Sequence, residues 1–277
     1  MPDLSLFDLS GKKALVTGGG LGIGRGCALA LAMAGADVAI VDHDEDMGRR
    51  AADAVKAVGG LGMFVHCDVR DSVSVQKMLN AVAQRFGRLD IAVNNAGIYR
   101  EGTDEILSKE DWDQVIAVNL TGVWLCARAE LDQMARQTPT EGKIINIASI
   151  AAITNLCNSN GSYDASKAAV THLTRTLAAR WGRHNINVNS VSPGYVLGGM
   201  GAHRSAEERQ QIRALTPLGH VQRVRDLYGP ILFLASKASD YVTGQNLVVD
   251  GGYTLSACLA PLERAVPPRI DPEGELS

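Results

Sequence analysis

A glycine-rich turn near the N-terminus constrains the fold more than any other stretch of this 277-residue sequence. It spans residues 17–24, follows the short apolar run 13–17 and precedes an Ala/Leu-rich helical run, 25–34. Glycines let the backbone turn tightly and approach a ligand closely. The helix that follows presents free N–H groups and the positive end of its dipole to an anion. A pyrophosphate meets that requirement, although an ordinary strand-to-helix connection also fits the turn taken alone.

The same alternation of apolar and helical runs continues along the chain. Short, continuous apolar runs are typical of strands buried on both faces, and their alternation with helices predicts βαβ units with right-handed crossovers. We therefore predict an α/β fold, a doubly wound, Rossmann-type parallel sheet of about seven strands flanked by helices on both faces. One such domain covers 1–258, and a Pro-rich tail, 259–277, follows. The predicted strands are 13–17, 37–42, 63–66, 89–94, 143–149, 186–192 and 246–249, and the predicted helices are 25–34, 45–58, 73–86, 109–137 with a break near 119–122, 162–181, 205–215 and 225–235.

Asp42 ends the second predicted strand, 24 residues after Gly18 and 18 after Gly24. A carboxylate about 20 residues past a glycine turn is placed to bind the two ribose hydroxyls of an adenosine. Asp42 could instead cap the next helix, a role that is also open to Asp44. A carboxylate here repels a 2′-phosphate, and no Arg or Lys lies in the glycine turn or directly after Asp42. The sequence therefore predicts NAD rather than NADP, with residues 49 and 50 the nearest arginines that could swing back.

Two further strand ends point to the same edge of the sheet. Ligands of open parallel sheets bind outside the carboxyl ends of the strands. Asp68 and Val69 follow the third strand, where Asp68 could accept a hydrogen bond from the adenine amino group. Asn95 and Gly97 follow the fourth, where small residues let the chain pass beside a cofactor. Each of these short segments, taken alone, is also typical of a turn.

The pattern Tyr163-x-x-x-Lys167 is a candidate for proton transfer. On a helix, a spacing of four places the two side chains on one face, one turn apart. A phenol loses its proton near pH ~10, and an ammonium within ~4–6 Å lowers that pKa by ~1–3 units. Taken alone, the pattern also fits a half-buried Tyr and a solvated Lys.

Taken together, these motifs make the sequence resemble the short-chain dehydrogenase/reductase family over residues 7–254, nearly the whole chain. Their order and spacing are much more specific than any one of them. The matching motifs are T-G-x-x-x-G-x-G at 17–24, C-D-V at 67–69, N-N-A-G at 94–97, Asn119 within V-N-L, Ser149, Y-x-x-x-K at 163–167, P-G at 193–194 and D-G-G at 250–252.

The resemblance implies a role for each matching residue. Tyr163 would be the general base in alcohol oxidation and the general acid in ketone reduction. Lys167 would hold the nicotinamide ribose and depress the pKa of Tyr163, and Ser149 would bind the substrate oxygen. Asn119 would hold a water chain behind Lys167. The implied cofactor contacts are Gly18, Leu21, Gly22, Ile23, Gly24, Asp42, Asp68, Val69, Asn95, Gly97, Tyr163, Lys167, Pro193, Gly194 and Val196.

Three features depart from the family pattern. Ser149 and Tyr163 are 14 residues apart where the family more often has 13, so we expect an insertion within 154–161, beside the substrate. Gly198 stands where the family often has a Thr that contacts the nicotinamide amide, although Val196 can still use its backbone. The tail, 259–277, is longer than usual. We expect it to be disordered, with an arm at a neighbouring subunit's active site as the alternative.

The predicted activity is NAD-dependent interconversion of a secondary alcohol and a ketone, of the polyol, sugar-acid or cyclic-alcohol type. An alternative is an NAD(P)H-dependent 3-oxoacyl-thioester reductase, because fold-level similarity does not choose between these substrates. Arg100 and Arg204 are the basic residues available to bind a substrate carboxylate. A non-catalytic cofactor sensor or scaffold is an alternative of another class, and four intact catalytic residues count against it. A dehydratase or epimerase of this family usually needs an added substrate domain, for which this chain has no room.

Composition bounds the compartment and the partners. A net charge of −3 with no block of like charges argues against nucleic acid or an anionic membrane as the main partner. Five scattered cysteines without a C-x-x-C pattern, and acids where a signal peptide would carry positive charge, favour a cytoplasmic protein with reduced thiols. We expect no metal site. The family resemblance implies a homotetramer that acts on small alcohols or ketones.

Overall fold

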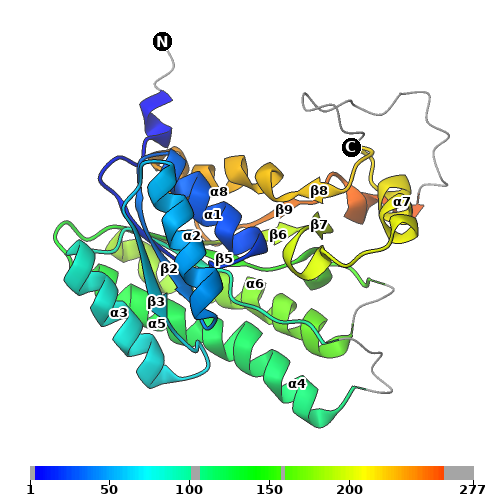
Figure 1. The fold of residues 1–277 in the computed structure, drawn as a ribbon, viewed down its shortest axis with the longest axis horizontal. Helices are drawn as coiled ribbons and strands as arrows, with labels where there is room; N and C mark the ends of the chain where they lie inside the picture. The colour runs from blue at the N-terminus through cyan, green and yellow to red at the C-terminus, as the bar shows by residue number, and fades with distance from the viewer. Residues whose placement is uncertain (1–3, 101–106, 157–159, 259–277) are drawn as a thin grey trace.

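Seven parallel strands form one sheet in a computed structural model that describes residues 4–100, 107–156 and 160–258. The strand order is β3-β2-β1-β4-β5-β6-β9 (Figure 1). It reverses direction between β1 and β4, which creates the switch point where ligands of such sheets bind. This order confirms the predicted doubly wound sheet. The strands are β1 (Lys13–Thr17), β2 (Asp37–Asp42), β3 (Gly62–His66), β4 (Ile91–Asn94), β5 (Gly142–Ile147), β6 (Ile186–Pro193) and β9 (Asn246–Val249).

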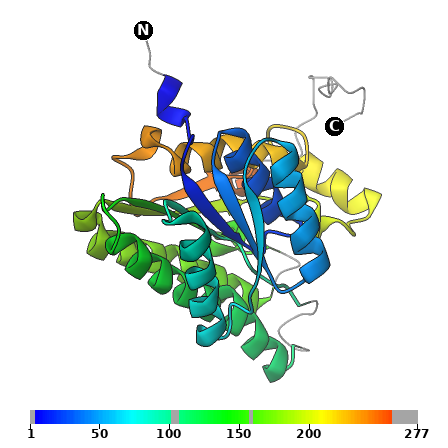
Figure 2. The same ribbon diagram turned by 60° about the vertical axis from the view of Figure 1, so that its left-hand side comes forward.

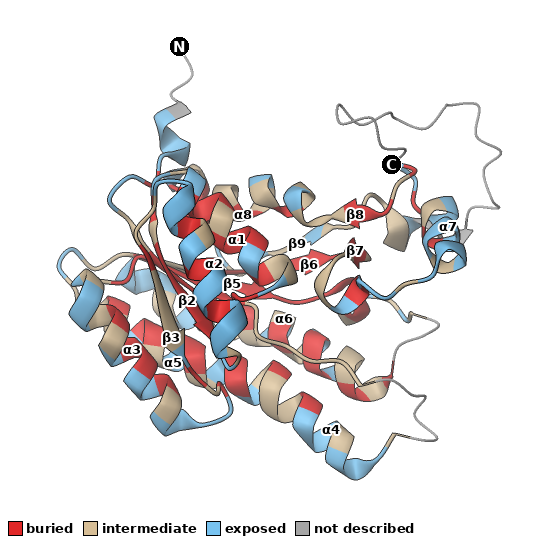
Figure 3. Ribbon diagram, viewed as in Figure 1, coloured by how far each residue is buried: buried red, intermediate tan, exposed pale blue. Residues whose placement is uncertain are grey.

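Helices cover both faces of the sheet (Figures 1 and 2). One layer contains α1 (Gly22–Met33), α2 (Glu45–Ala57) and α8 (Tyr228–Ala235). The other contains α3 (Ser72–Phe86), α5 (Val123–Ala135) and α6 (Gly161–Trp181), with α4 (Lys109–Ile116) against α6. The sheet carries one apolar core under each layer. Buried residues therefore follow the strands and the inward helix faces, while the outer helix faces are exposed (Figure 3).

The structure differs from the sequence prediction most in three places, and other predicted bounds shift by up to three residues, as in strands 89–94 and 143–149 and helix 225–235. The predicted break near 119–122 is a π-helical segment, Ala117–Gly122, which joins α4 to α5 without interrupting the helix. Helix α1 begins at Gly22, inside the glycine turn, and not at residue 25. The sequence analysis also missed a small parallel pair, β7 (Val196–Leu197) and β8 (Gln222–Arg223), which lies near α7 (Ala206–Leu215). Two-residue strands are too short to show a hydrophobic period.

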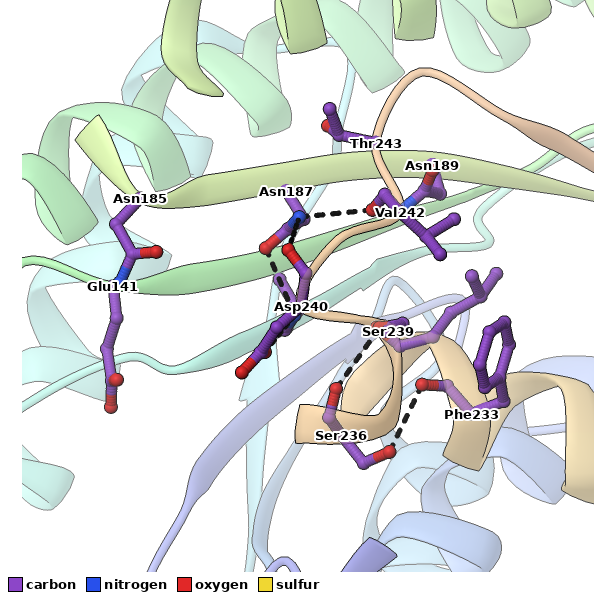
Figure 4. Close-up of polar contacts among 12 residues, drawn as sticks. Glu141, Asn185, Asn187, Asn189, Phe233, Ser236, Ser239, Asp240, Val242 and Thr243 are labelled. Atoms are coloured by element: carbon purple, nitrogen blue, oxygen red, sulfur yellow. Dashed lines mark hydrogen bonds and ion pairs between the residues drawn. The ribbon is translucent and has the colours of Figure 1, made fainter. Parts of the chain in front are cut away.

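Side-chain amides on β6 join this strand to the loop before the edge strand β9, at the end of the sheet opposite the cavity described below. Strand β6 pairs with β9 only from Ser190 onward. Before that point, Asn187 Nδ2 donates to the carbonyl oxygens of Asp240 and Val242, each at 3.0 Å. Asn189 Nδ2 donates to the same Val242 oxygen at 2.9 Å (Figure 4). These bonds satisfy the loop carbonyls where no strand partner is available.

Three further observations concern membranes, metals and thiols. Apart from the short gaps, no helix of residues 4–258 combines the length and apolarity needed to cross a bilayer. In the same described residues, no group of three or more His, Cys, Asp or Glu side chains is placed to hold a metal ion. Cys27, Cys67 and Cys126 are buried free thiols. Burial raises the pKa of the Cys27 thiol to about 12, so this residue is a packing group and not a nucleophile.

Candidate active site

A cavity of about 1150 Å³ opens at the carboxyl ends of the strands. Its wall contains every predicted cofactor and catalytic residue except Gly24 and Asn119. Those two lie directly behind the wall, as the contacts below describe. The fold thus brings together residues that the sequence spreads over 179 positions, from Gly18 to Val196.

The glycine turn is packed too tightly for side chains. A Cβ on Gly24 would stand 2.0 Å from the Gly18 carbonyl oxygen, and a Cβ on Gly18 would stand 2.9 Å from Ala96 Cα. Asn95 Nδ2 holds the turn by donating to the carbonyl oxygens of Thr17 and Gly18, at 3.1 and 2.9 Å. The predicted cofactor residue Asn95 therefore also fixes the loop to the end of β4.

Helix α1 begins at this cavity without a side-chain cap. Its N-cap residue, Leu21, makes no capping hydrogen bond. Each of α2, α3, α4, α6 and α7 has a side-chain cap, from Asp44, Asp71, Ser108, Asn160 and Ser205 respectively. The first N–H groups of α1 thus remain available to an anionic ligand. The tight glycines and the uncapped helix together fit the pyrophosphate of a dinucleotide.

Asp42 lies at the end of β2 with its carboxylate fixed by the backbone. One oxygen accepts from Gly20 N at 2.9 Å and the other from Asp44 N at 3.1 Å. Asp44 itself caps α2 by accepting from Met47 N, so the capping role considered for Asp42 belongs to Asp44. Arg49, one of the arginines that could have met a 2′-phosphate, is paired with Glu45 on its own helix. The geometry leaves Asp42 as a carboxylate in the cavity wall.

Arg70 is a residue at the adenosine end that the sequence analysis did not consider. It lines the cavity, and its guanidinium bonds both oxygens of the predicted adenine contact Asp68, with Nη2 to Oδ2 at 2.7 Å. Hydrogen bonds from this guanidinium lower the pKa of Asp68. The Asp68 carboxylate is therefore already paired, and the adenine amino group would share it with Arg70.

The predicted catalytic side chains converge at the other end of the cavity. Tyr163 and Lys167 lie one turn apart on α6, and Ser149 follows β5. The side chains of Ser149 and Tyr163 are hydrogen-bonded to each other. Lys167 Nζ donates to the Ile147 carbonyl oxygen at 3.0 Å and lies 5.7 Å from the centre of the Tyr163 ring. A substrate hydroxyl bound here would contact the hydroxyl groups of Ser149 and Tyr163, with the Lys167 ammonium nearby.

Burial shifts the proton affinity of both Lys167 and Tyr163. Lys167 is 3% exposed, and burial lowers its pKa to about 8. Burial raises the pKa of Tyr163, although the Ser149 hydrogen bond and the charge of Arg204 lower it. Tyr163 keeps part of its surface in the cavity, which weakens the effect of burial there. The lowering of the Tyr163 pKa that we expected from Lys167 thus stays a prediction, since Lys167 is not among the groups that shift this pKa.

Asn119 stands behind the pair, in the π-helical segment. Its amide donates to the Ile98 carbonyl oxygen at 2.9 Å and accepts from Ile98 N at 2.8 Å. It also contacts Ser166 Oγ at 3.3 Å, and Ser166 Oγ donates to the Tyr163 carbonyl oxygen at 2.7 Å. The sequence analysis missed Ser166, whose only signal is a hydroxyl next to Lys167. Asn119 Oδ1 and Lys167 Nζ each lie 3.4 Å from where a Cβ on Gly97 would stand.

The loop after β6 explains the departure at Gly198. This residue has φ +109°, a conformation that a β-branched Thr cannot adopt without strain. Upstream, Gly194 N donates to the Val249 carbonyl oxygen and to Gln222 Oε1, both at 2.9 Å. The chain therefore passes the predicted nicotinamide site with a glycine where the family often has a side-chain contact.

The predicted insertion is described only at its ends. Asn160 caps α6 by accepting from Tyr163 N, and its Nδ2 donates to the Arg100 carbonyl oxygen at 2.7 Å. Leu156 lines the cavity. Residues 157–159 of the insertion, and the tail 259–277, lie outside the described residues. Asn160, at the described end of the predicted insertion, thus links the start of α6 to Arg100.

Known proteins resemble this chain over nearly its whole length. A family profile described as enoyl-(acyl carrier protein) reductase matches residues 19–254. A sorbose reductase from Candida albicans is 37% identical over 91% of this chain and 90% of its own. A crystal structure of a short-chain type dehydrogenase/reductase from Mycobacterium marinum has a TM-score of 0.86 and 40% identity, covering 91% of this chain and 98% of that one. A gluconate 5-dehydrogenase from Burkholderia cenocepacia, solved with NADP and tartrate, has a TM-score of 0.86 and 36% identity over 92% and 99%.

Proposed function

The chain belongs to the short-chain dehydrogenase/reductase family, and from that membership we propose that it interconverts a secondary alcohol and a ketone with NAD. It is an oxidoreductase that acts on CH–OH groups with a nicotinamide cofactor. The observation that carries the proposal is the hydrogen-bonded pair Ser149 and Tyr163, beside buried Lys167, in the cavity into which the uncapped helix α1 opens. When bound, the nicotinamide supplies the hydride acceptor or donor.

The chain's own residues move and hold the proton. Tyr163 takes the hydroxyl proton of the alcohol during oxidation and returns a proton during reduction. Ser149 donates a hydrogen bond to the substrate oxygen and stabilises its developing charge. Lys167 holds the nicotinamide ribose, and its positive charge favours the phenolate. Asn119 holds the backbone behind Lys167, where we propose that the water chain runs.

The choice of NAD rests on Asp42. Its carboxylate occupies the end of β2, fixed by two backbone N–H groups, and would accept hydrogen bonds from the adenosine ribose. The same negative charge repels a 2′-phosphate. Because the similar gluconate 5-dehydrogenase was solved with NADP, overall likeness does not choose the dinucleotide. Arg70 supplies positive charge nearby, but Asp68 already pairs with it.

We propose a polyol or a sugar acid as the substrate. The similar proteins include a sorbose reductase and a gluconate 5-dehydrogenase, which are named for a ketose and a sugar acid. The second candidate is an acyl-carrier substrate, because the matching family profile is described as an enoyl-(acyl carrier protein) reductase. Homotetramer assembly is also a proposal. Trp112 and Trp124, 38% and 42% exposed on α4 and α5, are large apolar groups that a subunit interface would cover.

A substrate panel tests the function. Purified protein is assayed by NADH absorbance with NAD or NADP against alditols, aldonic acids, cyclic alcohols and, in the reductive direction, β-keto thioesters. Turnover of an alcohol with NAD supports the proposal. Activity on the thioesters alone would favour the second candidate, and no turnover with any member would leave the non-catalytic alternative. Gel filtration of the same sample measures the oligomer size.

A further inference from the structure

Besides Arg70, two arginines, Arg100 and Arg204, line the cavity that contains Tyr163, and their surroundings differ. The guanidinium of Arg100 is already paired: Nη2 donates to Gln114 Oε1 at 2.7 Å, and Nε lies 3.4 Å from the Asp111 carboxylate. Its positive charge is therefore balanced by the protein.

Arg204 has no such partner. Among the described residues no carboxylate forms an ion pair with it, and its Nε is buried without a hydrogen-bond partner. The guanidinium carbon lies 4.5 Å above the centre of the Tyr195 ring, and that ring meets Tyr253 edge-on at 5.1 Å. Glu208, the acid in the cavity wall on the adjoining helix, caps α7 by accepting from Ser205 N. A partly desolvated charge without a counter-ion is costly, so an anionic group would bind favourably beside Arg204.

The aromatic stack fixes where the charge sits. Stacking on Tyr195 restricts a long side chain that would otherwise be mobile, so less entropy is lost when an anion binds. Asp250 fixes the backbone that carries Tyr253, because its carboxylate accepts from Gly252 N and Thr254 N on either side of this residue. The positive charge of Arg204 also acts on the Tyr163 phenol, because it lowers the pKa of that group. Arg204 and Tyr163 both line this cavity.

We propose that Arg204 binds the carboxylate of the substrate, so that the preferred alcohol is a hydroxy acid held with its reacting hydroxyl at Tyr163 and Ser149. This proposal rests on the proposed function and adds the chemical class of the substrate. A guanidinium bonds a carboxylate with two N–H groups, which fixes the orientation of the acid as well as its affinity. A neutral alditol of the same length keeps the hydroxyl contacts and lacks this pairing.

The test compares an acid with its neutral counterpart in the full-length enzyme with saturating NAD. kcat/KM is measured for gluconate and for sorbitol in wild type, Arg204→Gln, Arg204→Lys and Arg100→Gln. We expect Arg204→Gln to lose roughly 10- to 100-fold more kcat/KM on gluconate than on sorbitol, since hydrogen bonds to charged groups contribute that much, with the KM for NAD within about twofold. Arg204→Lys should fall between. Arg100→Gln is the matched control, because it removes an equal charge that is already paired.

Three results would overturn the proposal. Equal losses on gluconate and sorbitol would assign Arg204 a structural role. A raised KM for NAD in Arg204→Gln would assign it to the cofactor. If Arg100→Gln loses the preference for gluconate over sorbitol and Arg204→Gln keeps it, the substrate carboxylate binds at Arg100.

Calorimetric titration of gluconate into the enzyme–NADH complex separates this proposal from the proposed function, because it requires no turnover. Weaker binding in Arg204→Gln supports the carboxylate site even if wild type oxidises neither compound. Equal gluconate affinity in wild type and Arg204→Gln overturns it. The absence of gluconate binding to both proteins overturns it as well. Turnover of sorbitol without any preference for gluconate would leave the proposed function intact and remove only the hydroxy-acid assignment.

Discussion

The cavity has two halves that are built in different ways. The cofactor half lies at the ends of β1, β2, β3 and β4 and the start of α1, and backbone groups and glycines form most of it. The substrate half lies between the loops after β4, β5 and β6 and the segment before α7, and side chains form most of it. Gly18 and Asn95 represent the first half, and Tyr195 and Arg204 the second. A backbone-built half can be shared by many enzymes, whereas a side-chain-built half can change its substrate with few substitutions.

Of the substitutions considered, Tyr163→Phe should reduce turnover most. It should affect only the substrate half of the cavity. The phenol is the proposed acid and base, and such groups contribute about 10²- to 10⁴-fold to the rate. We therefore expect kcat to fall by roughly a thousandfold, while NADH binding, followed by its fluorescence, stays as in wild type. Tyr99→Phe is the control, because this ring meets Tyr163 edge-on at 5.5 Å and would keep its packing. Near-normal turnover in Tyr163→Phe would contradict the mechanism.

A buried carboxyl group beneath the strand ends should make stability depend on pH. Glu130 is fully buried on α5, and burial raises its pKa to about 8. Its Oε2 accepts from Asn94 Nδ2 at 3.0 Å, while Glu130 Oε1 and Asn94 Oδ1 lack partners among the described residues. Between the ordinary Glu pKa of about 4.3 and about 8, the folded state keeps a proton that the unfolded chain releases. Stability therefore falls as the pH rises through this range.

Glu130→Gln tests this linkage. The amide has the same shape, carries no charge and can donate to the unpartnered Asn94 Oδ1. We expect the stability advantage of the variant over wild type to grow by about 4 kcal/mol from pH 5 to pH 9, since the folded state keeps the proton over about three pH units of that range and each unit corresponds to about 1.4 kcal/mol. Urea unfolding at both pH values measures the difference. Glu110→Gln, at an exposed position of α4, is the control. Equal gains at both pH values would show that charge is not the cause.

Gly24→Ala should damage the cofactor half selectively. The added Cβ would stand 2.0 Å from the Gly18 carbonyl oxygen, so the turn must move. Overpacking of this kind costs about 1–3 kcal/mol, and NADH affinity should fall by about tenfold or more. In contrast, a Cβ on Gly229 in α8 meets nothing within 4 Å, which makes Gly229→Ala the matched control. Unchanged NADH affinity in Gly24→Ala would mean that the turn does not contact the cofactor.

The difference between the halves also decides what the sequence could predict. The strand order and the positions of Gly18, Asp42 and Tyr163 follow from local patterns, because hydrophobic period, glycine and strand ends are properties of neighbouring residues. The partners of Arg70 and Arg204 do not follow from such patterns. Pairing of Asp68 with Arg70, and the absence of a partner for Arg204 among the described residues, depend on side-chain directions in three dimensions. The two-residue strands β7 and β8 pair with each other although they lie 26 residues apart in the sequence, which no local pattern shows.

The smallest predicted effect is also the one that distinguishes two dinucleotides. Asp42→Ala removes the proposed ribose acceptor and the charge that repels a 2′-phosphate. It also leaves Gly20 N and Asp44 N without their acceptor. We expect kcat/KM with NAD to fall about tenfold, since a hydrogen bond to a charged group contributes about 1.5–3 kcal/mol, and the ratio of NADP to NAD use to rise. Steady-state kinetics with both cofactors measures that ratio.

Asp44→Ala separates this specificity from simple damage to the loop. Asp44 caps α2 two residues further on, so its loss should lower the free energy of unfolding by about 1 kcal/mol and leave the cofactor ratio unchanged. If Asp44→Ala shifts the ratio as much as Asp42→Ala does, the preference comes from the shape of the loop and not from the Asp42 charge. If wild type already prefers NADPH, the paired Arg70 must release Asp68 to meet the 2′-phosphate, and Arg70→Gln should then abolish the preference. The adenosine end of the cofactor half would in that case depend on side chains, as the substrate half does.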